Sequence, residues 1–257
     1  MRLGIVGYGN MGSAFAKASK LLCEVVVYDV QEEKRQKALA EGFGVAKDLD
    51  FLLEASDWIL LAVKPKDAPA VLESLRGKLS SKVLVSMVAG LSLAKITELA
   101  GSSKVIRIMP NINALVGSAT IAYSFALGIG EVEKEEFLKV FSCCGSLYEV
   151  GEEMMDAFTA LAGSGPAFVF KFLHGLALAG VKEGFPYETA LSIVVDTVMG
   201  SCKLLKEMGK NPEEWVTRVA SPGGTTIEGI KLLEEKGFVG ILMECVERTS
   251  QKAKKLL

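Results

Sequence analysis

The fold is decided by the stretch RLGIVGYGNMG, residues 2–12. Its first five residues form a short apolar run that predicts a buried parallel strand, and residues 13–22 continue in helical rhythm. In a Gly-x-Gly-x-x-Gly turn between a first strand and a first helix, Gly7 would make the tight turn and Gly9 would admit a pyrophosphate. Gly12 would let the helix and strand pack closely. We therefore expect a dinucleotide site at this helix N-terminus; the alternative is a glycine-rich turn in a purely structural α/β domain.

Asp29 lies directly after a second apolar run, residues 24–28, at about the ~20-residue spacing typical of a ribose-binding carboxylate. Such a carboxylate accepts hydrogen bonds from both ribose hydroxyls and repels a 2′-phosphate, which favours NADH over NADPH. Asp29 could instead only cap a helix that begins near Gln31. The two roles are compatible.

Composition excludes several classes of protein. The 257 residues carry a formal net charge of −2 without a basic stripe, so no nucleic-acid partner is expected. Five cysteines without metal or redox spacing favour a reducing compartment, which predicts a cytoplasmic protein. A single histidine, His174, argues against a His-rich metal cluster, and no metal site is expected.

No targeting or membrane segment is predicted either. The chain enters its first predicted strand at once, which leaves no room for a signal peptide. It contains no uncharged apolar run of 18 residues, so no transmembrane helix and no membrane partner are expected.

Strands and helices alternate as far as residue 151, which predicts a Rossmann-type doubly wound sheet over residues 1–151. The expected strands are 2–6, 24–28, 44–46, 58–63, 83–88, 105–109, 119–123 and 147–150. The expected helices are 13–22, 31–41, 48–55, 68–75, 92–100 and 133–143, with Asp48 and Ser92 as N-caps.

Residues 152–257 carry only helical patterns, which predicts an all-α domain for substrate binding and dimerisation. Residues 167–181 and 190–202 are apolar nearly all round, and such helices must be buried on all sides. A domain of this size has too little surface to cover both, so we expect the same domain of a second subunit to do so. The alternative is a compact monomeric bundle.

A second motif, SPGGTT at residues 221–226, precedes an amphipathic helix. Two glycines and two hydroxyl residues at a helix N-terminus concentrate hydrogen-bond donors, which suits a small carboxylate. The alternative is an ordinary N-cap formed by Thr225 after a Pro-Gly turn.

Together with other segments, these motifs make the chain resemble the pyrroline-5-carboxylate reductases from end to end. The matching segments are GIVGYGNMG at 4–12, AVKP at 62–65, RIMPN at 107–111, VASPGGTTIE at 219–228 and LEEKGF at 233–238. The segment at 219–228 is long and specific, whereas the first is shared by many dehydrogenases.

The resemblance implies reduction of the cyclic imine 1-pyrroline-5-carboxylate to L-proline with NADH or NADPH, the last step of proline biosynthesis. It also implies a homodimer, which in some members assembles into a larger ring. The positions implied for the cofactor, with Asp29 from its spacing, are Gly7, Gly9, Asn10, Met11, Gly12, Asp29, Ala62, Val63, Lys64, Pro65, Met109, Pro110 and Asn111. Those implied for the substrate are Ser221, Gly223, Gly224, Thr225 and Thr226, with Thr226 as the catalytic residue that meets the ring nitrogen.

The chain departs from that family at two places. Ile112 and Asn113 stand where the family usually has Thr-Pro, and His174 and Leu178 stand where it usually has acidic residues. A lone histidine on an apolar face favours packing in an interface over catalysis.

Two other classes of protein share the glycine turn. The β-hydroxyacid dehydrogenases need a lysine at position 169, which is Val169 here, while Lys171 lies about 200° further round a helix. A catalytically silent nucleotide sensor would keep the glycine turn but would not need residues 221–226.

Overall fold

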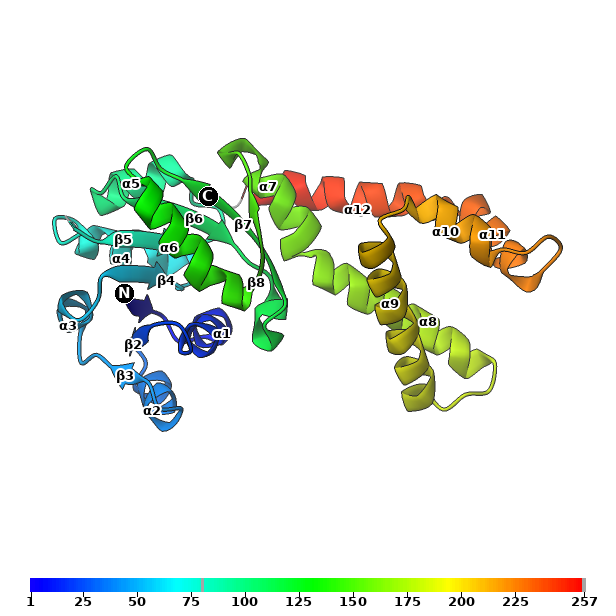
Figure 1. Ribbon diagram of the computed structural model, residues 1–257, viewed down its shortest axis with the longest axis horizontal. Coiled ribbons are helices and arrows are strands. Elements are labelled where there is room, and N and C mark those ends of the chain that lie inside the picture. Colours follow the sequence, from blue (N-terminus) through cyan, green and yellow to red (C-terminus); the bar gives the residue numbers. More distant parts are fainter. Residues whose placement is uncertain (80, 256–257) are drawn as a thin grey trace. The chain divides into compact units, whose positions relative to one another are not determined.

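The computed structural model describes residues 1–79 and 81–255 of the chain (Figure 1). Contacts between Cα atoms divide these residues into two compact units. The first comprises Met1–Pro166 together with the end of the last helix from Thr249, and the second comprises Ala167–Arg248. The first unit holds the whole β-sheet, and the described part of the second contains only helices.

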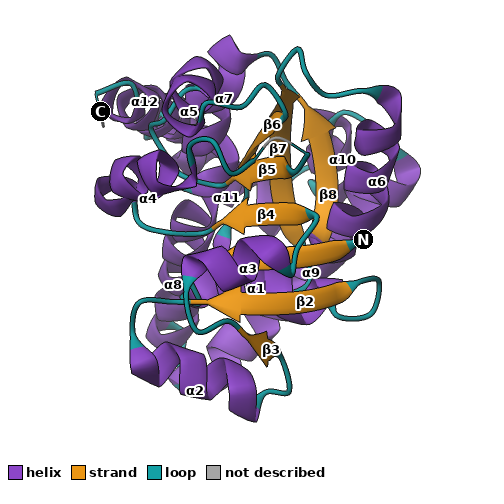
Figure 2. Cartoon of the chain, turned by 90° about the vertical axis from the view of Figure 1, so that its left-hand side faces the viewer, coloured by secondary structure: helices purple, strands orange, loops and turns teal. Residues whose placement is uncertain are grey.

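The first unit is built on one eight-stranded sheet with the order β3-β2-β1-β4-β5-β6-β7-β8 (Figure 2). Its strands are β1 (Arg2–Val6), β2 (Glu24–Tyr28), β3 (Gly44–Val45), β4 (Trp58–Leu61), β5 (Val83–Ser86), β6 (Val105–Met109), β7 (Ala119–Phe125) and β8 (Gly145–Glu149). The first six strands are parallel. Val6 pairs with Tyr28 on one side and Leu61 on the other, so β1, β2 and β4 end side by side. The strand order reverses between β1 and β4, and ligands of such sheets bind at this point.

Helices cover both faces of the sheet, in two apolar layers. They are α1 (Asn10–Ser19), α2 (Glu32–Ala40), α3 (Leu49–Glu54), α4 (Ala68–Leu75), α5 (Leu93–Ala100) and α6 (Glu131–Phe141). Leu3 and Ile5 of β1 pack in one cluster with buried residues of α1, α2 and α6, whereas Val6 packs with residues of α3, α4 and α5. Phe15 and Phe137 are fully buried, and burying each contributes roughly 2–3 kcal/mol. The predicted doubly wound Rossmann-type fold is confirmed.

The last two strands run opposite to the other six. β7 runs antiparallel to β6, and β8 is parallel to β7. The connection over residues 110–118 holds only the short 3₁₀ helix η2 (Ile112–Val116). A connection this short permits an antiparallel neighbour, whereas a parallel one needs a crossover of roughly a dozen residues or more.

A helical stretch follows β8 while still within the first unit. It consists of the 3₁₀ turn η4 (Glu152–Met154), α7 (Met155–Phe158) and the π-helix η5 (Thr159–Gly163). In the π-helix the N–H of Ser164 donates to the carbonyl of Thr159 at 2.8 Å. π-Helical turns are rare and are frequently found at functional sites.

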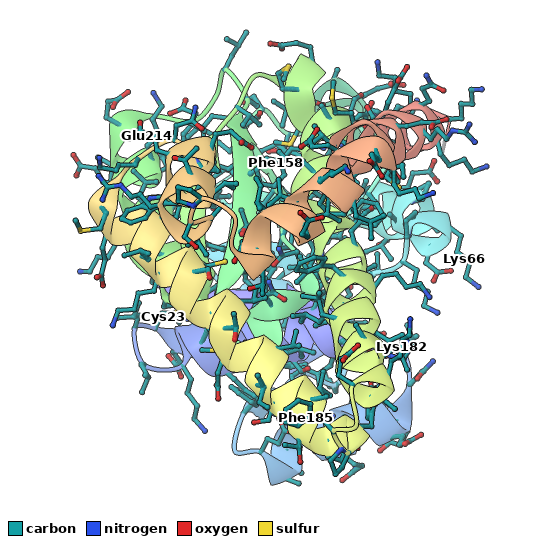
Figure 3. All side chains as sticks on the ribbon, turned by 90° about the vertical axis from the view of Figure 1, so that its right-hand side faces the viewer. Cys23, Lys66, Phe158, Lys182, Phe185 and Glu214 are labelled. Carbon is teal, nitrogen blue, oxygen red and sulfur yellow. The ribbon has the colours of Figure 1, made fainter. Side chains whose placement is uncertain are left out.

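The remaining helices are α8 (Gly165–Lys182), α9 (Tyr187–Met208), α10 (Pro212–Val219), α11 (Thr225–Glu235) and α12 (Phe238–Ala253). Lys182 and Phe185 mark the turn between α8 and α9 (Figure 3). These two helices pack closely where a Cβ on Gly180 would lie 2.8 Å from that of Ala190. The predicted all-α character of the region after residue 151 is confirmed.

Large apolar side chains of this helical region are exposed in the single chain. Phe170 is 59% exposed and Leu178 50% exposed. Others that share this exposure are Val169, Phe172, Leu176, Val181, Ile193, Met199, Ile241, Leu242 and Met243. An apolar surface of this extent indicates a further interacting surface.

The same apolar character makes one helical stretch long enough to cross a membrane. Glu152–Lys182 reaches a mean hydropathy of 1.3 in its most apolar window, only 11% of which is buried within the chain. A single stretch of this kind is weak evidence, because core helices of soluble proteins share its length and composition.

Candidate active site

The glycine turn after β1 packs tightly against the end of β4. The N–H of Gly7 donates to the carbonyl of Tyr28 at 2.8 Å, and Gly7 has a φ of 100°, which favours glycine. A Cβ on Gly7 would lie 2.6 Å from the carbonyl oxygen of Ala62, and one on Gly12 would lie 1.9 Å from that of Gly7. Gly9 differs, because a Cβ there would have no atom within 4 Å. Gly7 and Gly12 are thus required by packing, whereas Gly9 leaves open space.

The first turn of α1 is available to an anion. Gly9 is its N-cap and supplies no side-chain cap, and the turn contains no acidic residue. Its N–H groups and the positive end of the helix dipole are therefore not neutralised locally. Asn10 is exposed and Met11 is half-buried on this turn. The cradle fits the pyrophosphate of a dinucleotide.

Asp29 is held rigidly at the end of β2. One carboxylate oxygen accepts the N–H of Tyr8 at 2.7 Å, and the other accepts the N–H of Gln31 at 2.9 Å. Each oxygen keeps a lone pair for a further donor. The helix that follows has Gln31 as its N-cap, without a side-chain cap. Asp29 thus fixes both the glycine turn and the turn before α2.

Arg35, a cation close to Asp29, is held in place by contacts within its own loop and helix. Its guanidinium donates to the carbonyl of Asp29 at 2.7 Å and to that of Val30 at 3.2 Å, and it pairs with Glu32. These contacts turn it toward the backbone of its own loop. A 2′-phosphate would have to break them to recruit this charge.

Tyr8 is a structural residue that the motif analysis missed. It is 1% exposed, its hydroxyl donates to Glu41 at 2.6 Å, and its ring meets Phe43 edge-on. Burial, with the hydrogen bond to Glu41, raises the pKa of Tyr8 above its usual range, so the phenol stays neutral. A tyrosine between two glycines of a tight turn could have indicated such an anchor.

The ends of β4 and β6 lie at the same edge of the sheet. After β4, Ala62 and Val63 are half-buried, Lys64 is exposed and Pro65 begins a 3₁₀ turn. Ala62 also packs on the glycine turn, because its Cβ would be 3.3 Å from a Cβ on Gly12. Met109, the last residue of β6, is buried, and Pro110, which follows it, is half-buried. The predicted cofactor positions of the first unit therefore lie at or just beyond the carboxyl ends of parallel strands, at one edge of the sheet.

The side chain of Asn111 has a structural role in this structure. Its amide nitrogen donates to the carbonyl of Ala162 in the π-helix at 3.0 Å, and its amide oxygen accepts the N–H of Thr120 at 3.2 Å. Asn111 is 5% exposed. The side chain thus links β7 to the π-helix, and the cofactor role predicted for Asn111 would fall to its backbone.

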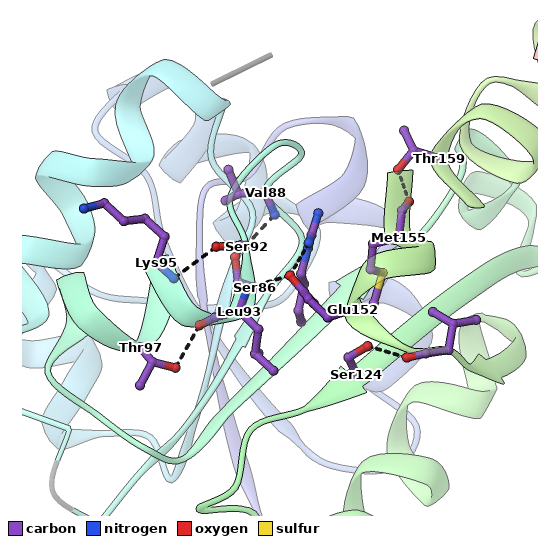
Figure 4. Close-up of polar contacts among 12 residues, drawn as sticks. Ser86, Val88, Ser92, Leu93, Lys95, Thr97, Ser124, Glu152, Met155 and Thr159 are labelled. Carbon is purple, nitrogen blue, oxygen red and sulfur yellow. Dashed lines mark hydrogen bonds and ion pairs between the residues drawn. The ribbon is translucent and has the colours of Figure 1, made fainter. Parts of the chain in front are cut away.

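A buried ion pair near this edge was also missed by sequence reasoning. Arg107, 4% exposed on β6, pairs with Glu152 at 2.5 Å. The same carboxylate oxygen of Glu152 accepts the N–H of Leu93 at 2.7 Å (Figure 4). Glu152 thereby joins the sheet, the start of α5 and the start of the helical region. Removing Glu152 would cost about 3–5 kcal/mol, because the charge of Arg107 would stay buried without a partner. The sequence signal for this ion pair is an arginine within an otherwise apolar strand, which needs a buried partner.

The second predicted site lies in the helical unit. Helix α11 begins at Thr225, and its N-cap is Gly224, which supplies no side-chain cap. The alternative of capping by Thr225 is therefore wrong, since Thr225 is already the first helical residue. Gly223 has a φ of 65°, and Thr226 is half-buried. The first turn of α11 presents unshared N–H groups beside the hydroxyls of Ser221, Thr225 and Thr226.

His174 lies within the helical unit. Its Nδ1 is 3.0 Å from the hydroxyl of Tyr187, and the two rings meet edge-on. This contact links α8 to α9 within one chain. Among residues 1–79 and 81–255, no group of three or more His, Cys, Asp or Glu side chains could hold a metal ion.

Comparison with known proteins separates the two regions. Residues 152–256 match the family model described as pyrroline-5-carboxylate reductase dimerisation. Residues 2–90 match the one described as NADP oxidoreductase, coenzyme F420-dependent. Over its full length the chain is 52% identical to a pyrroline-5-carboxylate reductase of Aquifex aeolicus, covering 97% of that protein. The chain belongs to the pyrroline-5-carboxylate reductase family.

Other members agree with this membership. The reductase of Escherichia coli is 33% identical, over 99% of this chain and 98% of its own. A solved reductase of Streptococcus pyogenes has a TM-score of 0.92 at 33% identity, covering 100% of this chain and 99% of the other. That of Plasmodium falciparum, solved with NADP bound, has a TM-score of 0.90 at 31% identity, covering 99% and 97%.

Substitutions of Gly12 and Gly9 test the packing of the turn and its binding of the cofactor separately. We expect Gly12→Ala to lower the free energy of unfolding by roughly 1–3 kcal/mol, because its Cβ would overlap the carbonyl of Gly7. Gly9→Ala should unfold like the parent, since its φ of −80° suits alanine and its Cβ meets nothing. It should nevertheless bind NADH about tenfold or more weakly. Urea denaturation and NADH fluorescence titration measure the two effects, and parent-like NADH affinity in Gly9→Ala would place the pyrophosphate elsewhere.

Proposed function

We propose that this protein is a pyrroline-5-carboxylate reductase, which reduces the C=N bond of 1-pyrroline-5-carboxylate to give L-proline. The observation that carries the proposal is family membership over the full chain together with two uncapped helix N-termini, one in each unit. A bound NADH or NADPH would supply the hydride. The relative of Plasmodium falciparum was solved with NADP, which supports a nicotinamide dinucleotide as cofactor.

The cofactor would be held at the edge of the first unit. The open cradle at Gly9, with Asn10 and Met11, suits the pyrophosphate, while Gly7 and Gly12 shape the turn. Asp29 would accept hydrogen bonds from the ribose hydroxyls. The loops after β4 and β6 would lie along the nicotinamide half; they comprise Ala62, Val63, Lys64, Pro65, Met109, Pro110 and the backbone of Asn111.

The substrate carboxylate would be held by the first turn of α11. The N–H groups of Thr225 and Thr226 begin this helix, Gly224 caps it without a side chain, and Ser221 and Gly223 shape the preceding turn. A carboxylate at such a helix end is stabilised by N–H donors and by the helix dipole. This fixes which face of the ring is presented for reduction.

Thr226 would orient the ring nitrogen by a hydrogen bond. The segment 221–226 contains no His, Asp or Glu, and an unperturbed hydroxyl is far too weak to act as an acid. The substrate would therefore enter as the iminium or take its proton from water. Positioning of this kind can lower a barrier by several kcal/mol.

Self-association follows from the helical region, since residues 152–256 match the dimerisation model of the family. We propose domains at 1–151 and 152–257, an obligate homodimer formed by the second, and a larger ring of dimers as the higher assembly. None of the five cysteines forms a disulfide in the described part of the chain, which fits the reducing environment of the cytoplasm.

The reaction assay tests the function and the substrate site together. Purified protein should oxidise NADH or NADPH only when pyrroline-5-carboxylate is added. Thr226→Ala should lower kcat/KM about 10–100-fold, the scale of one lost hydrogen bond of ~1.4–2.7 kcal/mol, and leave NADH binding intact. Thr217→Ala, on the neighbouring helix α10, is the matched control and should keep full activity. A fully active Thr226→Ala variant would refute the site assignment, and cofactor binding without imine-dependent oxidation would favour a sensor.

Cofactor preference is set by Asp29 in this proposal. We expect a higher kcat/KM with NADH than with NADPH, because a 2′-phosphate would oppose the carboxylate while Arg35 is held by Glu32. Asp29→Ser should reduce the NADH preference about tenfold. Glu33→Gln, which removes a neighbouring exposed charge, should not change it. Equal or better kinetics of the parent with NADPH would contradict the assignment.

A single charged substitution on α8 tests the proposed subunit interface. Leu178→Asp should disrupt the dimer and give monomeric or aggregated protein, because the side chain would be buried against the partner. Leu39→Asp on α2, 58% exposed in the single chain, is the matched control and should remain dimeric. Analytical ultracentrifugation at micromolar concentration decides between them. A stable, active monomer of the parent protein would refute the dimer.

A further inference from the structure

Three cysteines gather beside helix α1, and none of them is among the residues proposed to bind the cofactor or the substrate. Cys143 and Cys144 lie in the 3₁₀ turn η3 (Ser142–Cys144), with their sulfur atoms 3.8 Å apart. Cys23 follows α1, and its sulfur is 3.5 Å from the carbonyl of Ser19. Cys144 is fully buried, whereas Cys143 and Cys23 are partly exposed.

Cys143 forms part of the wall of a surface pocket of about 420 Å³. The pocket is lined by one stripe of α1 and by η2, and its walls are mostly apolar. Its other residues are Ser13, Ala14, Lys17, Ala18, Leu21, Leu22, Ala114, Leu115 and Gly117. The pocket contains none of the residues proposed for cofactor or substrate, so a ligand of this pocket can be tested separately from the proposed function.

The surroundings of Cys143 favour its thiolate. The buried hydroxyl of Ser19 has no hydrogen-bond partner while Cys143 is a thiol, and that thiol donates to the carbonyl of Val140 at 2.8 Å. Once the proton is lost, Cys144 and Ser19 can both donate to the sulfur. These donors, Cys144 first, outweigh burial and lower the pKa of Cys143 to about 7.

The other charged and titratable groups nearby do not reverse this. Lys17 lines the same pocket, although it pairs with Glu41 at 3.1 Å. Burial raises the pKa of Cys23, and the hydrogen bond to Cys143 together with burial raises that of Cys144. Of the three thiols, Cys143 alone combines access to the pocket with a stabilised thiolate.

We propose that Cys143 is a site of thiol–disulfide exchange with small disulfides whose apolar group fills the pocket between α1 and η2. The Cys143 thiolate attacks one sulfur of the small disulfide. A bond forms between Sγ and that sulfur, the original S–S bond breaks, and the second half leaves as a thiolate. No further oxidant is needed: Cys143 is oxidised to the mixed disulfide, and the half of the small disulfide that leaves is reduced to a thiolate.

The neutral aromatic disulfide dithiodipyridine is the probe. In the parent protein at pH 7 it should modify Cys143 first, about fivefold or more faster than exposed Cys202 and Cys245, because Cys144 and Ser19 stabilise the Cys143 thiolate and the pocket holds the aromatic group. Peptide mapping by mass spectrometry locates the adduct without any substitution. In a Cys202→Ser/Cys245→Ser background, Cys143→Ser should abolish the fast phase.

Two variants test the thiolate and the pocket separately. Ser19→Ala should move the midpoint of the rate–pH profile from about 7 to a higher pH, because a donor to the thiolate is lost. Ala18→Phe should fill the pocket and slow dithiodipyridine about fivefold or more, while methyl methanethiosulfonate, which needs little space, reacts at the parent rate.

The proposal is overturned if Cys202 or Cys245 reacts first, or if the midpoint lies at the ordinary thiol value. It is also overturned if Ser19→Ala leaves the midpoint unchanged, or if Ala18→Phe slows both reagents equally. Imine-dependent oxidation of NADH would be unaffected by any of these results, so this test and that of the proposed function fail independently.

Discussion

The contact between the glycine turn and the end of β4 is the constraint on which the rest of the first unit depends. A Cβ on Gly12 would lie 1.9 Å from the carbonyl oxygen of Gly7, and one on Gly7 would lie 2.6 Å from that of Ala62. Backbone atoms cannot yield as a flexible side chain can. This contact therefore fixes the angle at which α1 leaves β1, and with it the direction of the N–H groups in its first turn.

From that contact the local architecture extends in two directions. Toward β2, the N–H of Tyr8 holds the carboxylate of Asp29, which in turn holds the turn before α2. Toward β4, Ala62 meets both glycines, Gly7 through its backbone carbonyl and Gly12 through its small side chain. The glycine turn and the carboxylate of Asp29 are thus parts of one hydrogen-bonded assembly.

Most of the fold could be predicted from the sequence because its signals are local. The apolar runs gave the strands, and Asp48 and Ser92 cap α3 and α5 as expected, accepting N–H groups at 2.8 and 3.2 Å. The reversal of β7 could not be predicted, since it depends on how a short connection crosses the sheet. The roles of Arg107 and Glu152 also depend on residues far apart in the chain.

In the candidate site, too, the positions set by local motifs could be predicted, whereas contacts between distant residues could not. Motifs place the glycine turn and the segment 221–226 at helix N-termini, and the structure has both there. The side chain of Asn111 shows the limit of a motif, because its amide is used to hold the π-helix against β7. A sequence pattern gives the position of a residue, whereas the direction of its side chain is set by distant partners.

The apolar stretch at residues 152–182 is better explained by a subunit interface than by a membrane. Its first residue, Glu152, is held in an ion pair with buried Arg107, and its π-helix is bonded to Asn111. The part before residue 167 is therefore occupied in contacts within the first unit. α8 has 18 residues, somewhat short of the ~20 that span a bilayer, and Lys171 and His174 interrupt its apolar surface. A second copy of the same helices can cover these apolar faces and still leave polar groups near solvent, as a dimerisation domain requires.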